Sequence, residues 1–153
     1  MFGLGKTAAP GNTHPARGQD EGKLGAVLYL HGAGRVPVRV LAEVAASPVA
    51  RTVGLAGRMG LAPDQGMLFV FPSAAERSFW MRGTALSLDM LFVGVDRRIL
   101  GIVERAEPFT DSPRTVPGLA LYVLEVPGGF AGARGVAAGD LLEIAGLVAM
   151  EGA

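Results

Sequence analysis

The sequence predicts a mainly β protein: a compact β-barrel or sandwich of short strands with one short helix. Hydrophobic residues make up 50% of the 153-residue chain, and they gather in short runs that either alternate with polar residues or are continuously apolar. Gly and Pro, with 23 and 10 residues, separate these runs at close intervals and indicate frequent turns. A doubly wound α/β fold is not expected, because helical patterns between the strands are missing.

The first part of the chain predicts a β-hairpin followed by the helix. Residues 24–30 are rich in β-forming residues and residues 36–45 alternate in part, so the two runs are expected to pair. Ser47 is a suitable N-cap, and Pro48 suits the first helical position. The helix is expected to continue until Gly57.

Strands dominate the remainder of the chain. The apolar run 67–71, after a turn at 63–66, is expected to be a strand buried on both faces. A hairpin turn is expected at residues 96–97, and one helical turn within residues 127–135. The other predicted strands are residues 78–82, 88–95, 98–104, 119–126 and 141–150.

Composition argues against several classes of protein. The chain has 0 cysteines, which excludes disulfides, thiolate catalysis and zinc fingers. Its two histidines, His14 and His31, do not favour a metal site, and we expect neither a metal nor another cofactor. Basic and acidic residues number 14 each, and the resulting net charge of zero argues against a nucleic-acid partner. Membrane insertion is not expected, since no apolar run approaches the roughly 20 residues that span a bilayer.

The N-terminal region is expected to lie outside the folded domain. Residues 1–23 are rich in Gly, Pro and polar residues, which predicts a disordered tail, with a single mainly β domain over residues 24–150. The tail lacks the apolar segment of a secretory signal, and this favours a cytoplasmic protein. Residues 5–7, Gly-Lys-Thr, imitate the end of a P-loop, but the strand and the glycine that must precede it are missing.

Residues 31–34 read His-Gly-Ala-Gly directly after a predicted strand. This is the form of an α/β-hydrolase oxyanion loop. The matching nucleophile motif, G-x-S-x-G, is absent, so the turn of the hairpin is the favoured interpretation.

Two arginines follow the helix start at a spacing of seven residues. On a helix, Arg51, Leu55 and Arg58 would lie on nearly one face. Two guanidiniums on one stripe can bind a carboxylate or a phosphate through their fork geometry. The alternative, which is favoured, is that each arginine closes a structural salt bridge to an acid on the sheet.

Two acidic residues, Asp89 and Glu125, stand within apolar strands. Alternation places Asp89 on the face opposite Leu88 and Met90, where a carboxylate needs hydrogen bonds or a cation. Such acids could do acid/base chemistry. Buried ion pairs also perturb pKa values without catalysis, so a structural role is favoured.

Aromatic and thioether side chains are concentrated in the central strands. If these strands are adjacent, a face lined by such residues could hold an apolar or sugar-like ligand, although Phe and Met are more often core residues. Trp80 is singled out because its N–H needs a partner and large rings are seldom wholly buried. The set comprises Met67, Phe69, Phe71, Phe79, Trp80, Met81, Met90 and Phe92.

Six motifs follow one another in a recognisable order. They are residues 51–58 (RTVGLAGR), 64–71 (DQGMLFVF), 79–84 (FWMRGT), 88–93 (LDMLFV), 123–125 (VLE) and 139–140 (GD). Together they resemble family 192 of the domains of unknown function. The resemblance implies a compact mainly β barrel or sandwich with a short helix, implies no particular activity, and, because many members are exported, gives an extracytoplasmic location as the alternative.

The third motif departs from the family at one position. The family usually has Asn before Thr84, where this chain has Gly83. Either a ligand contact of that Asn is lost, or the position serves a turn with positive φ, which Gly adopts without steric cost. The second explanation is favoured.

Three functions remain open. The favoured one is a small non-enzymatic ligand-binding module with an Arg/Trp/Asp-lined pocket for a small polar or anionic ligand. A structural or partner-binding domain is the alternative. A hydrolase or lyase with Asp89 or Glu125 as base and Arg58 as anion clamp ranks last, because nucleophile motifs and paired histidines are absent. The predicted ligand-binding residues are Arg51, Arg58, Met67, Trp80, Thr84, Asp89 and Glu125.

Overall fold

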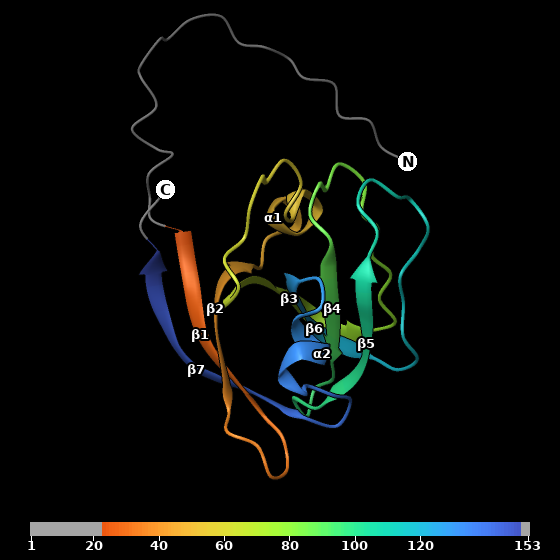
Figure 1. The fold of residues 1–153 in the computed structure, drawn as a ribbon. Coiled ribbons are helices and arrows are strands. Elements are labelled where there is room, and N and C mark those ends of the chain that lie inside the picture. Colours follow the sequence, from red (N-terminus) through yellow and green to blue (C-terminus); the bar gives the residue numbers. More distant parts are fainter. Residues whose placement is uncertain (1–22, 151–153) are drawn as a thin grey trace, which may run out of the picture.

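The computed structural model describes residues 23–150 and confirms the mainly β class. Seven strands form one sheet in the order β5-β4-β6-β3-β2-β1-β7 (Figure 1). The strands are β1 (Lys23–His31), β2 (Val38–Ala45), β3 (Gln65–Ala75), β4 (Leu88–Val93), β5 (Ile99–Ala106), β6 (Ala120–Pro127) and β7 (Leu141–Met150). The predicted N-terminal tail, apart from residue 23, and the P-loop-like residues 5–7 lie outside the described residues.

Neighbouring strands run antiparallel, except β2 and β3, which run parallel. The predicted hairpin is confirmed, because β1 and β2 pair antiparallel from Gly25 opposite Glu43 to Leu30 opposite Val38. A parallel pair needs a long crossover. Residues 46–64, which contain α1 (Pro48–Val53), provide it between β2 and β3.

The sheet curls without closing, so a barrel or sandwich describes it only loosely. β5 and β7 are its two edges. They approach each other where Arg98 and Leu141 form an isolated bridge, and where the Ile99 amide donates to the Asp140 carbonyl at 2.9 Å. In Figure 1, β7, β1 and β2 form one side of the molecule and β4 and β5 the other, with α1 at one end.

α1 begins as predicted and ends earlier than predicted. The Ser47 hydroxyl accepts the Ala50 amide at 3.1 Å, which confirms the N-cap. The helix ends at Val53, because Gly54 takes a positive φ of 50° and its amide closes on the Ala50 carbonyl. Arg58 is therefore not on the helix, and the predicted stripe of Arg51, Leu55 and Arg58 is wrong.

The predicted strand at residues 78–82 is also wrong. Only Phe79 pairs, in an isolated bridge to Arg114 whose two amide-to-carbonyl hydrogen bonds measure 2.9 and 2.7 Å. The chain then turns at Gly83, which has a φ of 68°. A second helix, α2 (Phe130–Arg134), confirms the helical turn expected within residues 127–135.

The sheet separates two apolar clusters, because alternate residues of each strand point to opposite faces. Leu68, Leu91 and Leu124 pack in the first cluster together with Phe130 of α2. The second cluster has residues of the other parity and also takes in Leu55, which follows α1. Its residues from the central strands are Met67, Phe69, Met90, Phe92 and Val123.

Candidate functional site

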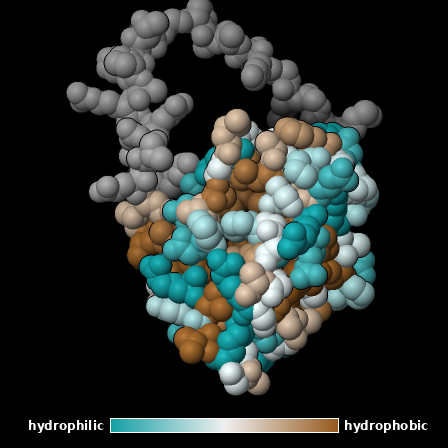
Figure 2. Space-filling view, viewed as in Figure 1, coloured by the Kyte–Doolittle hydropathy of each residue, from teal (hydrophilic) through white to brown (hydrophobic). Residues whose placement is uncertain are grey.

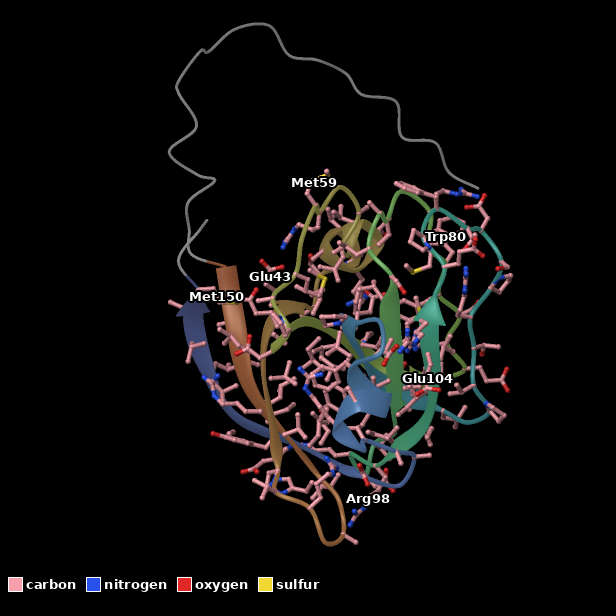
Figure 3. The ribbon with its side chains drawn as sticks, in the orientation of Figure 1. Glu43, Met59, Trp80, Arg98, Glu104 and Met150 are labelled. Carbon is pink, nitrogen blue, oxygen red and sulfur yellow. The ribbon has the colours of Figure 1, made fainter. Side chains whose placement is uncertain are left out.

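A hollow of about 600 Å³ opens beside α1, and we call it the α1 hollow. It is bounded by α1, by β3 with the loop that follows it, and by residue 125 of β6. Ligand sites commonly have volumes of about 300–1,000 Å³. In Figure 3, Trp80, one of its lining residues, lies toward the end of the molecule that carries α1. On the face shown in Figure 2, hydrophobic residues are scattered in patches among hydrophilic ones, without one broad apolar surface.

Glu125 lines the α1 hollow from the middle of the sheet and is only 4% exposed. Its strand neighbours in register are Met67 on β3 and Met90 on β4, so apolar side chains flank it. Within residues 23–150, no donor makes a hydrogen bond or an ion pair with its carboxyl group. Burial raises the pKa of Glu125 from 4.5 to about 8. The group is therefore a neutral acid at pH 7.

Thr84 is the second buried polar side chain of the hollow, at 7% exposure. Its backbone is fixed by the Met81 carbonyl, which accepts the Thr84 amide at 3.1 Å, and by the Phe109 amide, which donates to the Thr84 carbonyl at 3.1 Å. Its hydroxyl group has no hydrogen-bond partner in the part of the chain that the structure describes. Buried polar groups normally have partners. We call Glu125 and Thr84 the inner end of the hollow.

Two arginines of the hollow, Arg51 and Arg77, converge on the ring of Phe71. Their guanidinium carbons lie 5.2 and 3.8 Å from the ring centroid. Arg51 donates to the carbonyls of Ala46 and Val70, at 2.5 and 3.1 Å. The Arg77 guanidinium donates to backbone carbonyls as well, among them that of Ala120 at 3.4 Å.

Neither of these guanidiniums forms an ion pair with an acidic side chain of residues 23–150. Burial, and then the positive charge of Arg51, lower the pKa of Arg77. Each guanidinium also keeps N–H donors that the backbone carbonyls do not use, Nε and Nη2 on Arg51 and Nη1 on Arg77. The pair is thus a positive site with free donors.

Trp80 stands at the exposed rim of the hollow, with 51% of its surface accessible. The Arg82 guanidinium lies 3.8 Å from the ring centroid of Trp80 and donates to both carboxylate oxygens of Asp111, at 3.0 and 3.2 Å. This hydrogen-bonded pair raises the pKa of Arg82 and lowers that of Asp111. Among residues 23–150, Arg82 is therefore ion-paired with Asp111, in contrast to Arg51 and Arg77.

Asp89, fully buried, lies on the other face of the sheet from Glu125. Glu125 pairs with Met90, so the adjacent residue Asp89 points away from the α1 hollow. Its carboxylate accepts three backbone amides, from Arg105 at 2.8 Å, Gly129 at 2.9 Å and Ala131 at 2.9 Å. Asp89 therefore ties β5 and the start of α2 to β4. The two buried acids do not converge.

Arg58 and Met67 are likewise outside the α1 hollow. Arg58 donates to Glu43 at 2.6 Å, which is the structural ion pair that the sequence analysis favoured, although the acid is neither Asp89 nor Glu125. In Figure 3, Glu43 and Trp80 lie on opposite sides of α1. Met67 lines a separate hollow of about 220 Å³. Of the predicted residues, the structure brings together Arg51, Trp80, Thr84 and Glu125.

A family model described as "Uncharacterized ACR", family 192 of the domains of unknown function, matches residues 30–144, well over half of the chain. The chain belongs to this family. Among curated proteins, none matches the chain.

Two solved structures resemble this member of family 192. A Sinorhizobium meliloti 1021 protein, proposed to be a transcription regulator, is 35% identical, with a TM-score of 0.76 over 80% of this chain and 94% of its own. A protein of unknown function from Novosphingobium aromaticivorans DSM 12444 is 33% identical, with a TM-score of 0.74 over 92% of this chain and 99% of its own.

The departure from the family-192 pattern at Gly83 has a structural explanation. Gly83 has a φ of 68°, the left-handed region that Gly and Asn adopt most readily. A Cβ atom at this position would meet only the Ala56 Cβ, at 3.7 Å. A turn with positive φ is therefore sufficient to explain Gly83 at this position.

Arg77 is the residue that the sequence analysis missed. The predicted strand stopped before Pro72, since Pro interrupts strands. In the structure β3 continues to Ala75, because Pro72 falls where the register with β6 shifts between Val70 and Ala75. Arg77 follows the end of β3 by two residues and lies beyond that register shift, so the alternation of Phe69 and Phe71 does not extend to it and no local pattern indicates it.

No group of three or more His, Asp or Glu side chains within residues 23–150 is placed to hold a metal ion. Over the same residues, neither helix is long and apolar enough to cross a membrane.

Proposed function

We propose that this chain is a small, non-enzymatic ligand-binding module whose α1 hollow takes an organic anion, a carboxylate or a phosphate. The observation that carries the proposal is the pair Arg51 and Arg77, two guanidiniums beside one hollow without an acidic partner in the described chain. Guanidiniums recognise carboxylates and phosphates through parallel N–H donors. The aromatic walls Phe71 and Phe79 suit an apolar body attached to the anion.

Electrostatics favour an anion over a neutral ligand. Three arginines line the hollow, Arg51, Arg77 and Arg82, and among residues 23–150 only Arg82 has an acid paired with it. The positive charges of Arg77 and Arg51 repel each other, and this repulsion adds to burial, the larger cause, in lowering the pKa of Arg77. An anion bound between them would relieve the repulsion.

The proposal is tested with the intrinsic fluorescence of Trp80, the single tryptophan of the chain, which stands at the rim. Benzoate should change this fluorescence saturably, whereas benzamide, its neutral counterpart, should not. Arg51→Gln and Arg77→Gln should each weaken benzoate binding roughly 10-fold or more, as expected for a lost charge-assisted hydrogen bond. Phenyl phosphate in place of benzoate separates the two anion classes.

The control variant is Arg98→Gln, because Arg98 is exposed and lies at the opposite end of the molecule from Trp80 (Figure 3). It should bind benzoate like the parent protein. Melting temperatures of all three variants report folding. Equal responses to benzoate and benzamide, or full affinity in folded Arg51→Gln and Arg77→Gln, would reject the proposal.

The other functions have weaker support. Acid/base chemistry by Asp89 and Glu125 together is disfavoured because they occupy opposite faces of the sheet. A partner-binding role would use Val49 and Val53 of α1, which are 74% and 55% exposed, but nothing in the structure indicates what would cover them. The regulator role proposed for the Sinorhizobium protein is not carried over, because a net charge of zero does not favour nucleic acid.

A further inference from the structure

The inner end of the α1 hollow has polar side chains that the proposed anion site does not use. Glu125 and Thr84 are 4% and 7% exposed, line the hollow, and have no hydrogen-bond partner among residues 23–150. In a well-packed core an apolar residue is expected at position 125, because both strand neighbours, Met67 and Met90, are apolar. Both side chains line the hollow, where a ligand that fills it would meet their polar atoms.

The charged groups around the hollow do not satisfy Glu125. They are Arg51 of α1, Glu76 and Arg77 after β3, and Arg82 and Asp111 at the rim. None of them shifts the pKa of Glu125, which burial alone raises to about 8. Burial, and not a neighbouring charge, therefore sets the raised pKa of Glu125. At neutral pH the Glu125 carboxyl carries its proton and is a hydrogen-bond donor.

We infer that the ligand is an organic acid that also bears an uncharged carbonyl-type acceptor, with the acid group held by Arg51 and Arg77 and the carbonyl oxygen held by Glu125 and Thr84. This inference rests on the proposed function and adds the chemical class of the ligand. Glu125 and Thr84 are the specificity-determining residues. A carbonyl oxygen has two lone pairs, so it can accept from both hydroxyl groups at once.

The chemistry also says which ligands the inner end rejects. An apolar group would leave two buried hydroxyl groups without partners, and such groups are costly to desolvate. A second anionic group at the inner end would be taken out of water beside an acid, which is costly for a charge. The inner end thus selects a neutral acceptor, while the arginines select the anion.

The test compares 4-acetylbenzoate with 4-isopropylbenzoate, two acids of nearly equal shape that differ in one carbonyl oxygen. Homologues of both acids, with one or two methylenes between the ring and the carboxylate, are included because the distance between the arginines and the inner end can require a longer ligand. At pH 6.5 the acetyl compound of the best-fitting pair should bind roughly 10-fold more tightly, the usual effect of an unmet buried donor. The preference should disappear as the pH rises above about 8, where Glu125 ionises.

Three variants make the result specific. Glu125→Gln keeps a donor and should retain the preference at every pH, whereas Glu125→Leu should keep only the smaller preference that Thr84 supplies, with no dependence on pH. Thr84→Val should reduce it. Glu104→Gln, the same change at an exposed position on β5 (Figure 3), should behave like the parent protein.

The two proposals fail in distinguishable ways. If both compounds bind equally and binding still depends on Arg51 and Arg77, the inference about the carbonyl is overturned while the anion site stands. A preference that keeps its full size in Glu125→Leu overturns it as well. If neither compound binds through the arginines, the proposed function fails and this inference falls with it.

Discussion

Replacing Glu125 by Gln is expected to stabilise the folded chain at neutral pH, and to do so progressively less as the pH is lowered. The pKa of Glu125 is raised by burial from 4.5 to about 8. Between these two pH values the folded chain holds a proton that the unfolded chain has released. The free energy of unfolding of the parent protein is therefore highest below pH 4.5 with respect to Glu125, and it falls as the pH rises toward 8. Gln has no proton to lose.

The magnitude follows from the interval between the two pKa values, 3.5 pH units. Each unit corresponds to about 1.4 kcal/mol, so the full effect is about 5 kcal/mol at pH 8 and above, and about 3 kcal/mol at pH 7. For a domain of this size, about 3 kcal/mol corresponds to a rise in melting temperature of roughly 10 °C.

The assay is thermal and urea unfolding of the parent protein and of Glu125→Gln from pH 4.5 to 8.5. The difference in unfolding free energy should grow across this range with a slope approaching about 1.4 kcal/mol per pH unit. Glu104→Gln, at an exposed position, should show no comparable growth. A difference between Glu125→Gln and the parent that is the same at pH 5 and pH 8 would refute the reasoning.

Substitutions at three other positions test the framework around the hollow. Asp89→Asn should cost about 2–4 kcal/mol of stability, because an amide cannot accept all three backbone N–H groups, and unchanged melting would show that those bonds matter little. Gly66→Ala should cost about 3 kcal/mol, since its Cβ would lie 2.3 Å from the Glu125 carbonyl oxygen, and a stable variant with parent-like spectra would argue against this strand contact. Gly83→Asn should be nearly neutral whereas Gly83→Val should cost about 1–2 kcal/mol, and calorimetry showing equal effects would contradict the positive φ.

The sequence predicts the local features of this fold well. Ser47 and Pro48 carry the information for the start of α1 on their own, because capping involves only the next few residues. The end of α1 depends on more distant contacts. The Gly57 amide donates to the Gly83 carbonyl at 3.1 Å, and Leu55 packs in the core, so tertiary contacts turn the chain away from the helix at Gly54.

The candidate site is predicted only in part, for the same physical reason. Alternation within one strand shows that Asp89 is buried, but the amides that satisfy it come from Gly129 and Ala131, 40 and 42 residues away. The sequences of the two strands do not distinguish Asp89, whose carboxylate accepts three hydrogen bonds, from Glu125, whose carboxyl group has no partner among residues 23–150. Arg77 is brought to Arg51 by the path of β3 past Pro72, and a local pattern that ends at Pro72 does not include it.

The most direct test of the anion site observes the arginine side chains themselves. In ¹H–¹⁵N NMR spectra of the arginine Nε–H groups, adding benzoate should shift the signals of Arg51 and Arg77 together, with a common binding curve, and leave that of Arg98 in place. If millimolar benzoate leaves Arg51 and Arg77 unmoved, or shifts all arginines alike, the α1 hollow is not an anion-binding site.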